Sequence, residues 1–203
     1  MKASTIPTLT LAGGALCLDF VNTVDDYRSE HPSEYLTDYA ALAAWGRHVE
    51  ILDPERMKKL IATAAQRPEE AARVHQQALA LRAALYRLFT TRRTNRKPQA
   101  EDLIDLNELL GEALSQGRLR LVEDQYLWHW TGKSDNLVQI LYPVVRSAAD
   151  LLTSDRLASL GECENCGWLF IDTSRNHSRR WCTMEACGNR AKARRHYQRS
   201  RKN

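Results

Sequence analysis

Four of the five cysteines lie close together near the C-terminal end of the chain, in the spacing C-x2-C-x15-C-x4-C. They are Cys163, Cys166, Cys182 and Cys187. Two cysteines three positions apart can turn both sulfurs toward one point, and a second pair can complete the tetrahedral thiolate site that zinc favours. Gly167 follows the first pair, where a tight turn is expected. The pattern predicts one structural zinc ion per chain, with a small folded module around it.

Two other interpretations of the cysteines stay open at this point. Disulfides belong mainly to oxidising compartments, but no continuous apolar run of a secretory signal precedes Asp19, so we expect a cytoplasmic protein. A redox C-x-x-C motif normally begins a helix beside a βαβ pattern, which this sequence lacks. The spacing of four residues in the second pair departs from the usual two. His177 or His196 could replace a cysteine ligand, and isolated Cys17 is expected to be a buried apolar side chain.

The charge of the chain is unevenly distributed. The formal net charge is +4, but residues 175–203 hold ten Lys or Arg against one acidic residue, whereas residues 1–174 carry a net charge of −5. A basic end on a mildly acidic body is typical of a protein that brings that end to a polyanion. No run of about 18 apolar residues exists, so we expect no membrane-spanning helix and no membrane partner.

Helical patterns dominate the first two-thirds of the chain. They predict helices over residues 37–49, 54–66, 68–91, 100–115 and 136–152. Thr37, Asp53 and Asp135 are the predicted N-caps, and Pro143 should kink the last helix or mark a join. Residues 118–124 and 126–132 alternate apolar and polar side chains, which indicates a β-hairpin. We therefore predict an α+β, mainly helical domain over residues 1–155.

The cysteine-rich segment, residues 156–203, is predicted to form a second, smaller domain. Residues 168–172 have strand character, residues 180–182 could return as a second strand, and a helix should begin near Cys187. Ala193 and Tyr197 lie four residues apart and could pack that helix on the module. A C-x-x-C turn, a hairpin and a helix bearing the last ligand together describe a treble-clef-like zinc finger.

Two segments resemble a known family. CENCGWLFID and WCTMEACGNR are similar to the CGNR zinc finger, whose signature stands here at Cys187, Gly188, Asn189 and Arg190. GGALCLDFVNT, residues 13–23, resembles the opening signature of the ABATE-type domain that precedes this finger in the family. The resemblance covers nearly the whole chain. It implies zinc carried by the four cysteines and a stress-related bacterial transcription regulator.

The basic segment is a candidate nucleic-acid surface. Eight of its ten basic residues are arginines, whose forked guanidinium donors suit phosphate oxygens. Two alternatives are that arginines near the metal neutralise the thiolates, and that the last residues are a solvated terminus. The candidate nucleic-acid contacts are Arg179, Arg180, Asn189, Arg190, Lys192, Arg194, Arg195 and Arg199.

A second candidate site lies in the first domain. Asp19 and Asn22 follow an apolar run, and Trp128 and Trp130 lie on the predicted hairpin, so these four residues could line a pocket for a small effector. The commoner uses of such residues are backbone capping for the first pair and core packing for the second. No P-loop, dinucleotide-binding glycine pattern, nucleophile elbow or H-E-x-x-H motif occurs, and we expect no enzymatic activity.

Together these features predict a cytoplasmic transcription regulator. Its N-terminal domain would sense a small molecule or form a homodimer, and its finger would bind DNA. The alternative is a zinc-finger adaptor that binds RNA or a protein partner through the same helix. An enzyme acting on a small molecule through the first domain is a third and weaker option.

Overall fold

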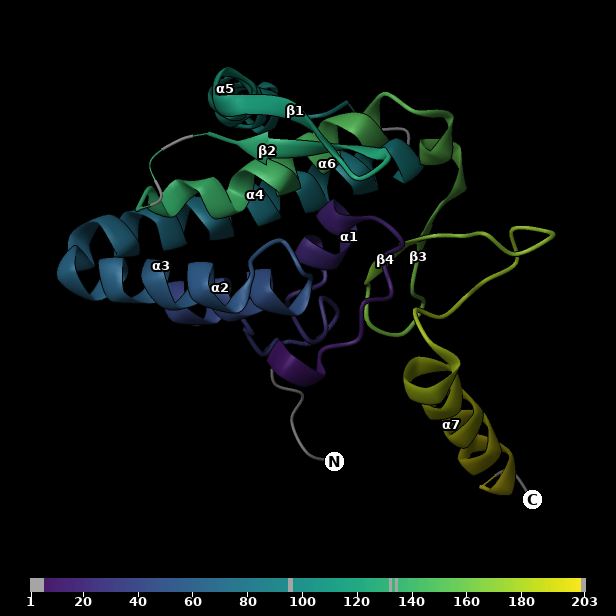
Figure 1. Ribbon diagram of the computed structural model, residues 1–203. Helices are drawn as coiled ribbons and strands as arrows, with labels where there is room; N and C mark the ends of the chain where they lie inside the picture. Colours follow the sequence, from purple (N-terminus) through teal and green to yellow (C-terminus); the bar gives the residue numbers. More distant parts are fainter. Residues whose placement is uncertain (1–5, 95–96, 132, 134, 202–203) are drawn as a thin grey trace.

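Helices form most of the structure, and two small antiparallel hairpins complete it. The computed structural model in Figure 1 describes residues 6–94, 97–131, 133 and 135–201, without the side chains of residues 92–94, 195, 196 and 199. The helices before the finger are α1 (Leu16–Val21), α2 (Tyr39–His48), α3 (Pro54–Gln66), α4 (Pro68–Thr94), α5 (Ala100–Gln116) and α6 (Tyr142–Leu152). Short 3-10 turns occupy Ile6–Thr8, Leu137–Leu141 and Asp155–Ser159. The predicted α+β, mainly helical class is confirmed.

The helix boundaries follow local capping chemistry. Asp53 caps α3 as predicted, because its side chain accepts a hydrogen bond from the Arg56 N–H. The predicted cap Thr37 is wrong by one residue, since the Asp38 carboxylate takes this role for α2. Asp135 is also not a cap; its carboxylate pairs with Arg67 at 2.6 Å, and Asn136 caps the 3-10 turn that follows. An Asx side chain caps each of these three starts, as the short side-chain oxygen favours.

Pro143 marks a join between two helical segments, as the sequence predicted. The 3-10 turn Leu137–Leu141 ends one residue before α6, and Pro143 occupies the first turn of α6. Proline is tolerated there because the N–H groups of the first turn have no partner within the helix. After this join, α6 packs along both α1 and α5.

The core is built around α4, which packs against α1, α2, α3 and α5. The predicted apolar face of this helix is confirmed, because its residues are all buried: Val74, Ala78, Leu81, Leu85, Leu88 and Phe89. Cys17 on α1 is fully buried, which confirms its expected apolar role, and burial raises the pKa of its thiol to about 12. None of the described helices combines the length and the apolar character that a bilayer crossing requires.

The first hairpin follows α5 and lies on the surface. Strand β1 (Gly117–Val122) pairs with β2 (Gln125–Trp130) in antiparallel register, with Leu119 opposite Trp128. Residues opposite each other share a face, so Leu119, Leu121, Tyr126 and Trp128 line one side of the hairpin. All four side chains are exposed.

The finger begins with a hairpin that differs from the predicted one. Strand β3 (Leu160–Glu162) pairs with β4 (Leu169–Ile171) across the C-x-x-C turn. The predicted return strand at residues 180–182 is wrong. The carbonyl oxygens of Trp181 and Cys182 instead accept hydrogen bonds from the Arg179 guanidinium. The finger ends in a π-helical turn, Met184–Gly188, that continues into α7 (Asn189–Ser200).

Helix α7 projects away from the rest of the molecule (Figure 1). The expectation that Ala193 and Tyr197 pack on the finger is wrong, since Ala193 is exposed and Tyr197 is 66% exposed. The composition explains this result, because the helix has too few large apolar residues to bury one face.

The finger is hydrogen-bonded to the segment that follows α1. Asn22 is 1% exposed and pairs with both backbone groups of Leu169: its Nδ2 donates to the carbonyl oxygen at 2.8 Å, and its Oδ1 accepts from the N–H at 2.9 Å. The Trp168 indole N–H donates to the Val24 carbonyl, and the Tyr27 N–H donates to the Cys166 carbonyl. One continuous apolar core includes residues of both segments. The domain division between residues 155 and 156 remains a sequence prediction.

We expect Asn22→Ala to lower the free energy of unfolding by about 2–5 kcal/mol, because it leaves the buried N–H and C=O of Leu169 without partners. Urea denaturation followed by far-UV circular dichroism measures this change. Asn107→Ala, at an exposed position on α5, is the matched control and should change stability by less than about 0.5 kcal/mol. Equal effects of the two substitutions would contradict the conclusion that the hydrogen bonds of Asn22 hold the finger to the N-terminal segment.

Candidate metal centre and basic helix

The first two cysteines are brought together by the turn between β3 and β4. Cys163 directly follows β3; its N–H donates to the Trp168 carbonyl at 2.8 Å, and its carbonyl accepts from the Gly167 N–H at 3.0 Å. Gly167 has a φ of +77°, in the left-handed region that favours glycine. A Cβ at this position would also lie 2.9 Å from Cβ of Tyr27. The glycine therefore allows both the turn and its close approach to the N-terminal segment.

The second pair of cysteines approaches from the other side of the finger. Cys182 lies in the irregular segment after β4, and Cys187 lies in the π-helical turn before α7. Thr183 starts that turn: its hydroxyl accepts from the Ala186 N–H, and its carbonyl accepts from the Gly188 N–H. The capped turn positions Cys187 at the base of α7, so the direction of the helix depends on this ligand.

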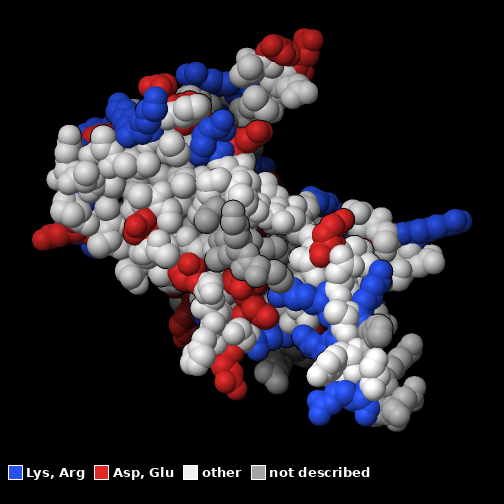
Figure 2. All heavy atoms as spheres, turned by 90° about the horizontal axis from the view of Figure 1, so that it is seen from below, with Lys and Arg blue, Asp and Glu red and all other residues white. Residues whose placement is uncertain are grey.

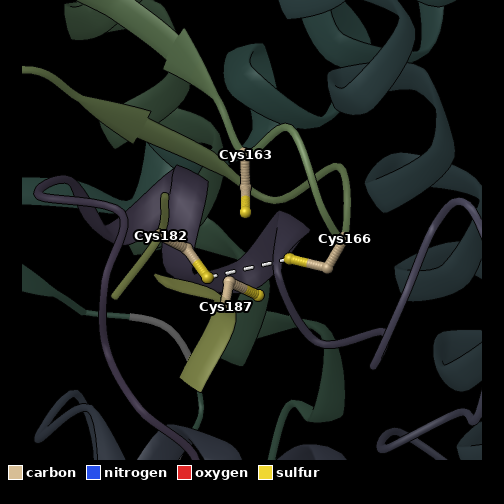
Figure 3. A group of neighbouring side chains, drawn as sticks. All are labelled: Cys163, Cys166, Cys182 and Cys187. Atoms are coloured by element: carbon tan, nitrogen blue, oxygen red, sulfur yellow. Dashed lines mark hydrogen bonds between the residues drawn. The ribbon is translucent and has the colours of Figure 1, made fainter. Parts of the chain in front are cut away.

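The four sulfurs meet at one buried point (Figure 3), with all four Sγ atoms within 4.8 Å of one another. The cysteines are free thiols with exposed fractions of 0–3%. The Sγ atoms of Cys166 and Cys182 are 3.7 Å apart, and a tetrahedral zinc with Zn–S bonds of about 2.3 Å separates its sulfurs by about 3.8 Å. This donor set fits zinc, and at 3.7 Å this pair is much too far apart for a disulfide bond.

Hydrogen bonding among the four thiols favours the thiolate at Cys163 and raises the pKa of Cys166 and Cys182. Hydrogen bonds from the thiols of Cys166, Cys182 and Cys187 hold the pKa of Cys163 well below its usual range. Outside the cluster, the Asn165 amide lies 3.5 Å from Sγ of Cys187 as a donor, and the Arg194 guanidinium donates to Oδ1 of Asn165 at 3.2 Å. This chain links the first turns of α7 to a ligand. Asn165 was missed in the sequence, although its place between Cys163 and Cys166 was a usable signal.

The histidines considered as alternative ligands do not join the cluster where the structure describes them. His177 lies in the loop after β4, where its Nδ1 is 3.0 Å from the Asp172 carbonyl oxygen. The side chain of His196 is outside the described residues. The only group of metal-ligating side chains found in the described part of the chain is that of the four cysteines.

Comparison with family models identifies the chain. Residues 14–155 match the ABATE model, which is described as "putative stress-induced transcription regulator". Residues 159–200 match the CGNR zinc finger model. The chain therefore belongs to the ABATE family and carries a CGNR zinc finger after that region, as the sequence resemblance implied. A search of the curated proteins gave no match.

The basic residues divide into two groups. Arg179 is half-buried, donates to the carbonyls of Ala12, Trp181 and Cys182, and stacks on the Phe170 ring at 4.1 Å. Arg180 forms a two-pronged ion pair with Glu164. These two guanidinium groups are thus already used within the protein, and the contacts described for them are to backbone carbonyl oxygens and to Glu164, not to the thiolates that the alternative named.

The remaining candidate phosphate contacts lie on or beside α7. Arg190 and Lys192 are exposed and have no ion-pair partner among the described residues. Asn189 is exposed, and its Nδ2 donates to the Glu185 carbonyl at 3.1 Å. Arg194 is exposed beyond its contact with Asn165. The side chains of Arg195 and Arg199 lie outside the described residues.

In Figure 2, Lys and Arg side chains gather on the projecting helix, and acidic side chains lie on the adjacent body.

The structure does not bring the four candidate effector contacts together. Asn22 forms two hydrogen bonds to the backbone of Leu169 in β4, and Asp19 accepts a hydrogen bond from the Gly13 N–H at 2.8 Å. Both therefore act on the backbone, as the commoner use of these residue types suggests. Trp128 and Trp130 line a separate cavity next to α3, in which neither Asp19 nor Asn22 takes part.

We expect Cys187→Ser to lose the metal and to destabilise the whole chain, because the finger shares its core and its hydrogen bonds with the N-terminal segment. Metal analysis after dialysis against a chelator should give one zinc per chain for the wild type and less than this for the variant. Cys17→Ser changes a buried thiol outside the cluster and should retain the metal. Unchanged metal content in Cys187→Ser would exclude this ligand set.

Asp19 should make stability depend on pH. Burial raises the pKa of its carboxyl from 3.8 to about 6, against the lowering effects of the Gly13 N–H and His48. The folded protein therefore binds this proton more tightly than the unfolded chain, and stability falls as pH rises from about 4 to 6. Asp19→Asn keeps an acceptor for Gly13 and removes this titration.

The stability of Asp19→Asn relative to wild type should therefore increase from pH 4 to 6 and level off above that range. Urea denaturation of both proteins in matched buffers measures the difference, in which the titration of shared groups cancels. A constant difference across this range would show that the Asp19 carboxyl has an ordinary pKa.

Proposed function

We propose that this protein is a DNA-binding transcription regulator. A structural zinc ion, held by Cys163, Cys166, Cys182 and Cys187, supports α7 as the DNA-contacting element. The helical segment before it senses a small molecule. The observation that carries the proposal is α7: a basic helix that begins beside a buried four-cysteine cluster and projects from the rest of the molecule, whose residues 1–174 carry a net charge of −5.

The charge of α7 supports contact with a nucleic acid. Between Asn189 and Ser200 the helix has no acidic residue and carries one lysine among its arginines. Such a helix has few apolar residues to bury against another protein surface, whereas phosphate groups can neutralise its charge and release counterions. Arg190 and Lys192 are exposed near the cysteine cluster. The end of α7 that the cluster holds in place therefore presents cations without an ion-pair partner among the described residues.

The description of the ABATE family as a stress-induced transcription regulator favours DNA over RNA as the partner. Sequence-independent contacts would come from the arginine and lysine side chains. Aromatic groups for stacking single-stranded bases are scarce in this region, since Tyr197 is the one aromatic residue in α7. We propose no catalytic role, because four thiolates leave no open position on zinc for water or a substrate.

We expect the double variant Arg190→Ala and Lys192→Ala to bind genomic DNA fragments more weakly, because two phosphate contacts are lost. In a plot of log affinity against log salt concentration, the slope should become less negative by roughly 2. Fluorescence anisotropy at several salt concentrations measures both effects, and zinc content should stay unchanged.

The matched control is Lys58→Ala with Arg73→Ala, which removes the same charge from exposed positions on α3 and α4. Its affinity and salt slope should equal those of the wild type. If both double variants lose the same affinity, the finger is not the binding surface. Absence of DNA binding at low salt, with binding to RNA or a protein instead, would favour the adaptor alternative.

A further inference from the structure

A cavity of about 400 Å³ lies between the hairpin and the helical body. Its walls come from four parts of the chain: the turn from α2 to α3, the first half of α3, strand β2, and the join before α6. The volume is within the usual range for small-molecule sites. The residues that matter for binding are Glu50, Asp53, Arg56, Trp128, Trp130 and Gln139.

One wall of the cavity carries an unneutralised cation. Arg56 on α3 is half-buried, and its guanidinium donates to Oε1 of Gln139. Among the described residues it has no carboxylate partner within ion-pair distance. Gln139 is 7% exposed, and its Nε2 is buried without a hydrogen-bond partner in the described part of the chain. A half-buried guanidinium and an unpaired amide donor on the same wall suit an acceptor with negative charge.

The opposite wall is aromatic. The rings of Trp128 and Trp130 have centroids 6.4 Å apart and an interplanar angle of 28°. Both residues point to the same face of the hairpin, because they are two positions apart in β2. The Arg146 guanidinium covers the Trp128 ring at 4.4 Å, which fixes the ring against the body. Such a wall suits a flat apolar group.

Two acidic residues also line the cavity, and their exposure determines how strongly their charges act on a bound molecule. Glu50 and Asp53 are exposed, so water and salt screen their charges. The Asp53 carboxylate is in addition used to cap α3 through the Arg56 N–H. Arg56 is half-buried and is therefore less screened than either acid.

We propose that this cavity binds a small aromatic carboxylate, with its carboxylate on Arg56 and Gln139 and its flat ring against Trp128 and Trp130. This inference rests on the sensing part of the proposed function and names the class of molecule sensed. The four residues come from three separate elements, α3, β2 and the turn before α6, so a bound molecule bridges the hairpin and the helical body.

The test uses three probes of nearly equal shape: indole-3-acetate, indole-3-acetamide and tryptamine, which are anionic, neutral and cationic. The full-length, zinc-loaded, ¹⁵N-labelled protein is titrated with each probe, and the five tryptophan indole N–H signals are followed by NMR. Trp128→Phe and Trp130→Phe assign the two relevant signals. We expect indole-3-acetate to shift these two and to bind at least about tenfold more tightly than the other probes, because charged hydrogen bonds are the stronger ones.

Arg56→Gln tests the cation while keeping a hydrogen-bond donor. It should weaken indole-3-acetate at least about tenfold and leave indole-3-acetamide unchanged. Arg73→Gln, at an exposed position on α4, is the matched control and should change neither affinity. A dispersed NMR spectrum confirms that each variant is folded.

Four results would overturn the proposal. They are equal or tighter binding of the neutral or cationic probe, unchanged indole-3-acetate affinity in Arg56→Gln, shifts confined to the other three indole signals, and no shift with any probe at millimolar concentration. The titrations contain no DNA. A negative result here therefore leaves DNA binding by the finger unaffected, and failure of DNA binding would leave the cavity result unaffected.

Discussion

The convergence of four cysteine sulfurs at one buried point is the constraint on which the exposed end of the molecule depends. The finger has short strands and an irregular connection between β4 and the turn that holds Cys187. Such a segment buries little apolar surface of its own, and a chelated metal supplies binding free energy that becomes folding free energy. The helix that leaves the cluster adds almost no packing. Its starting direction is therefore set by the turn around Cys187 and by the chain from Arg194 through Asn165 to that ligand.

The second constraint is the attachment of this finger to the N-terminal segment. The side chain of Asn22 bonds to Leu169 as a neighbouring strand would, because one amide supplies both a donor and an acceptor to the backbone of β4. Helix α1 contacts both β4 and α6, and Pro143 in the first turn of α6 lines the cavity. Packed elements thus connect the cavity to the finger without a flexible linker. Contact alone does not make a switch, which also needs two discrete arrangements of these elements.

The sequence predicted those features that depend on local chemistry. The cysteine spacing identified the four clustered residues, the Asp53-Pro54 pair located the start of α3, and the period of α4 located its buried face. The predictions that failed depend on contacts distant in sequence. The strand expected at residues 180–182 is absent because Arg179 binds its carbonyls. The role of Asn22 required knowledge of where β4 lies, and no periodicity within the first 30 residues contains that information.

Arginine has two separate roles in the finger, and position relative to the chelate decides between them. Arg179 precedes Cys182, faces inward, and satisfies carbonyl oxygens that no strand partner reaches. Arg190 follows Cys187, lies on α7 and remains exposed. Composition cannot separate these roles, since both residues belong to the same basic segment. The distinction follows from the direction in which the chain leaves the cysteine cluster, because α7 begins after Cys187 and projects from the body, whereas Arg179 lies before Cys182 and binds backbone carbonyl oxygens.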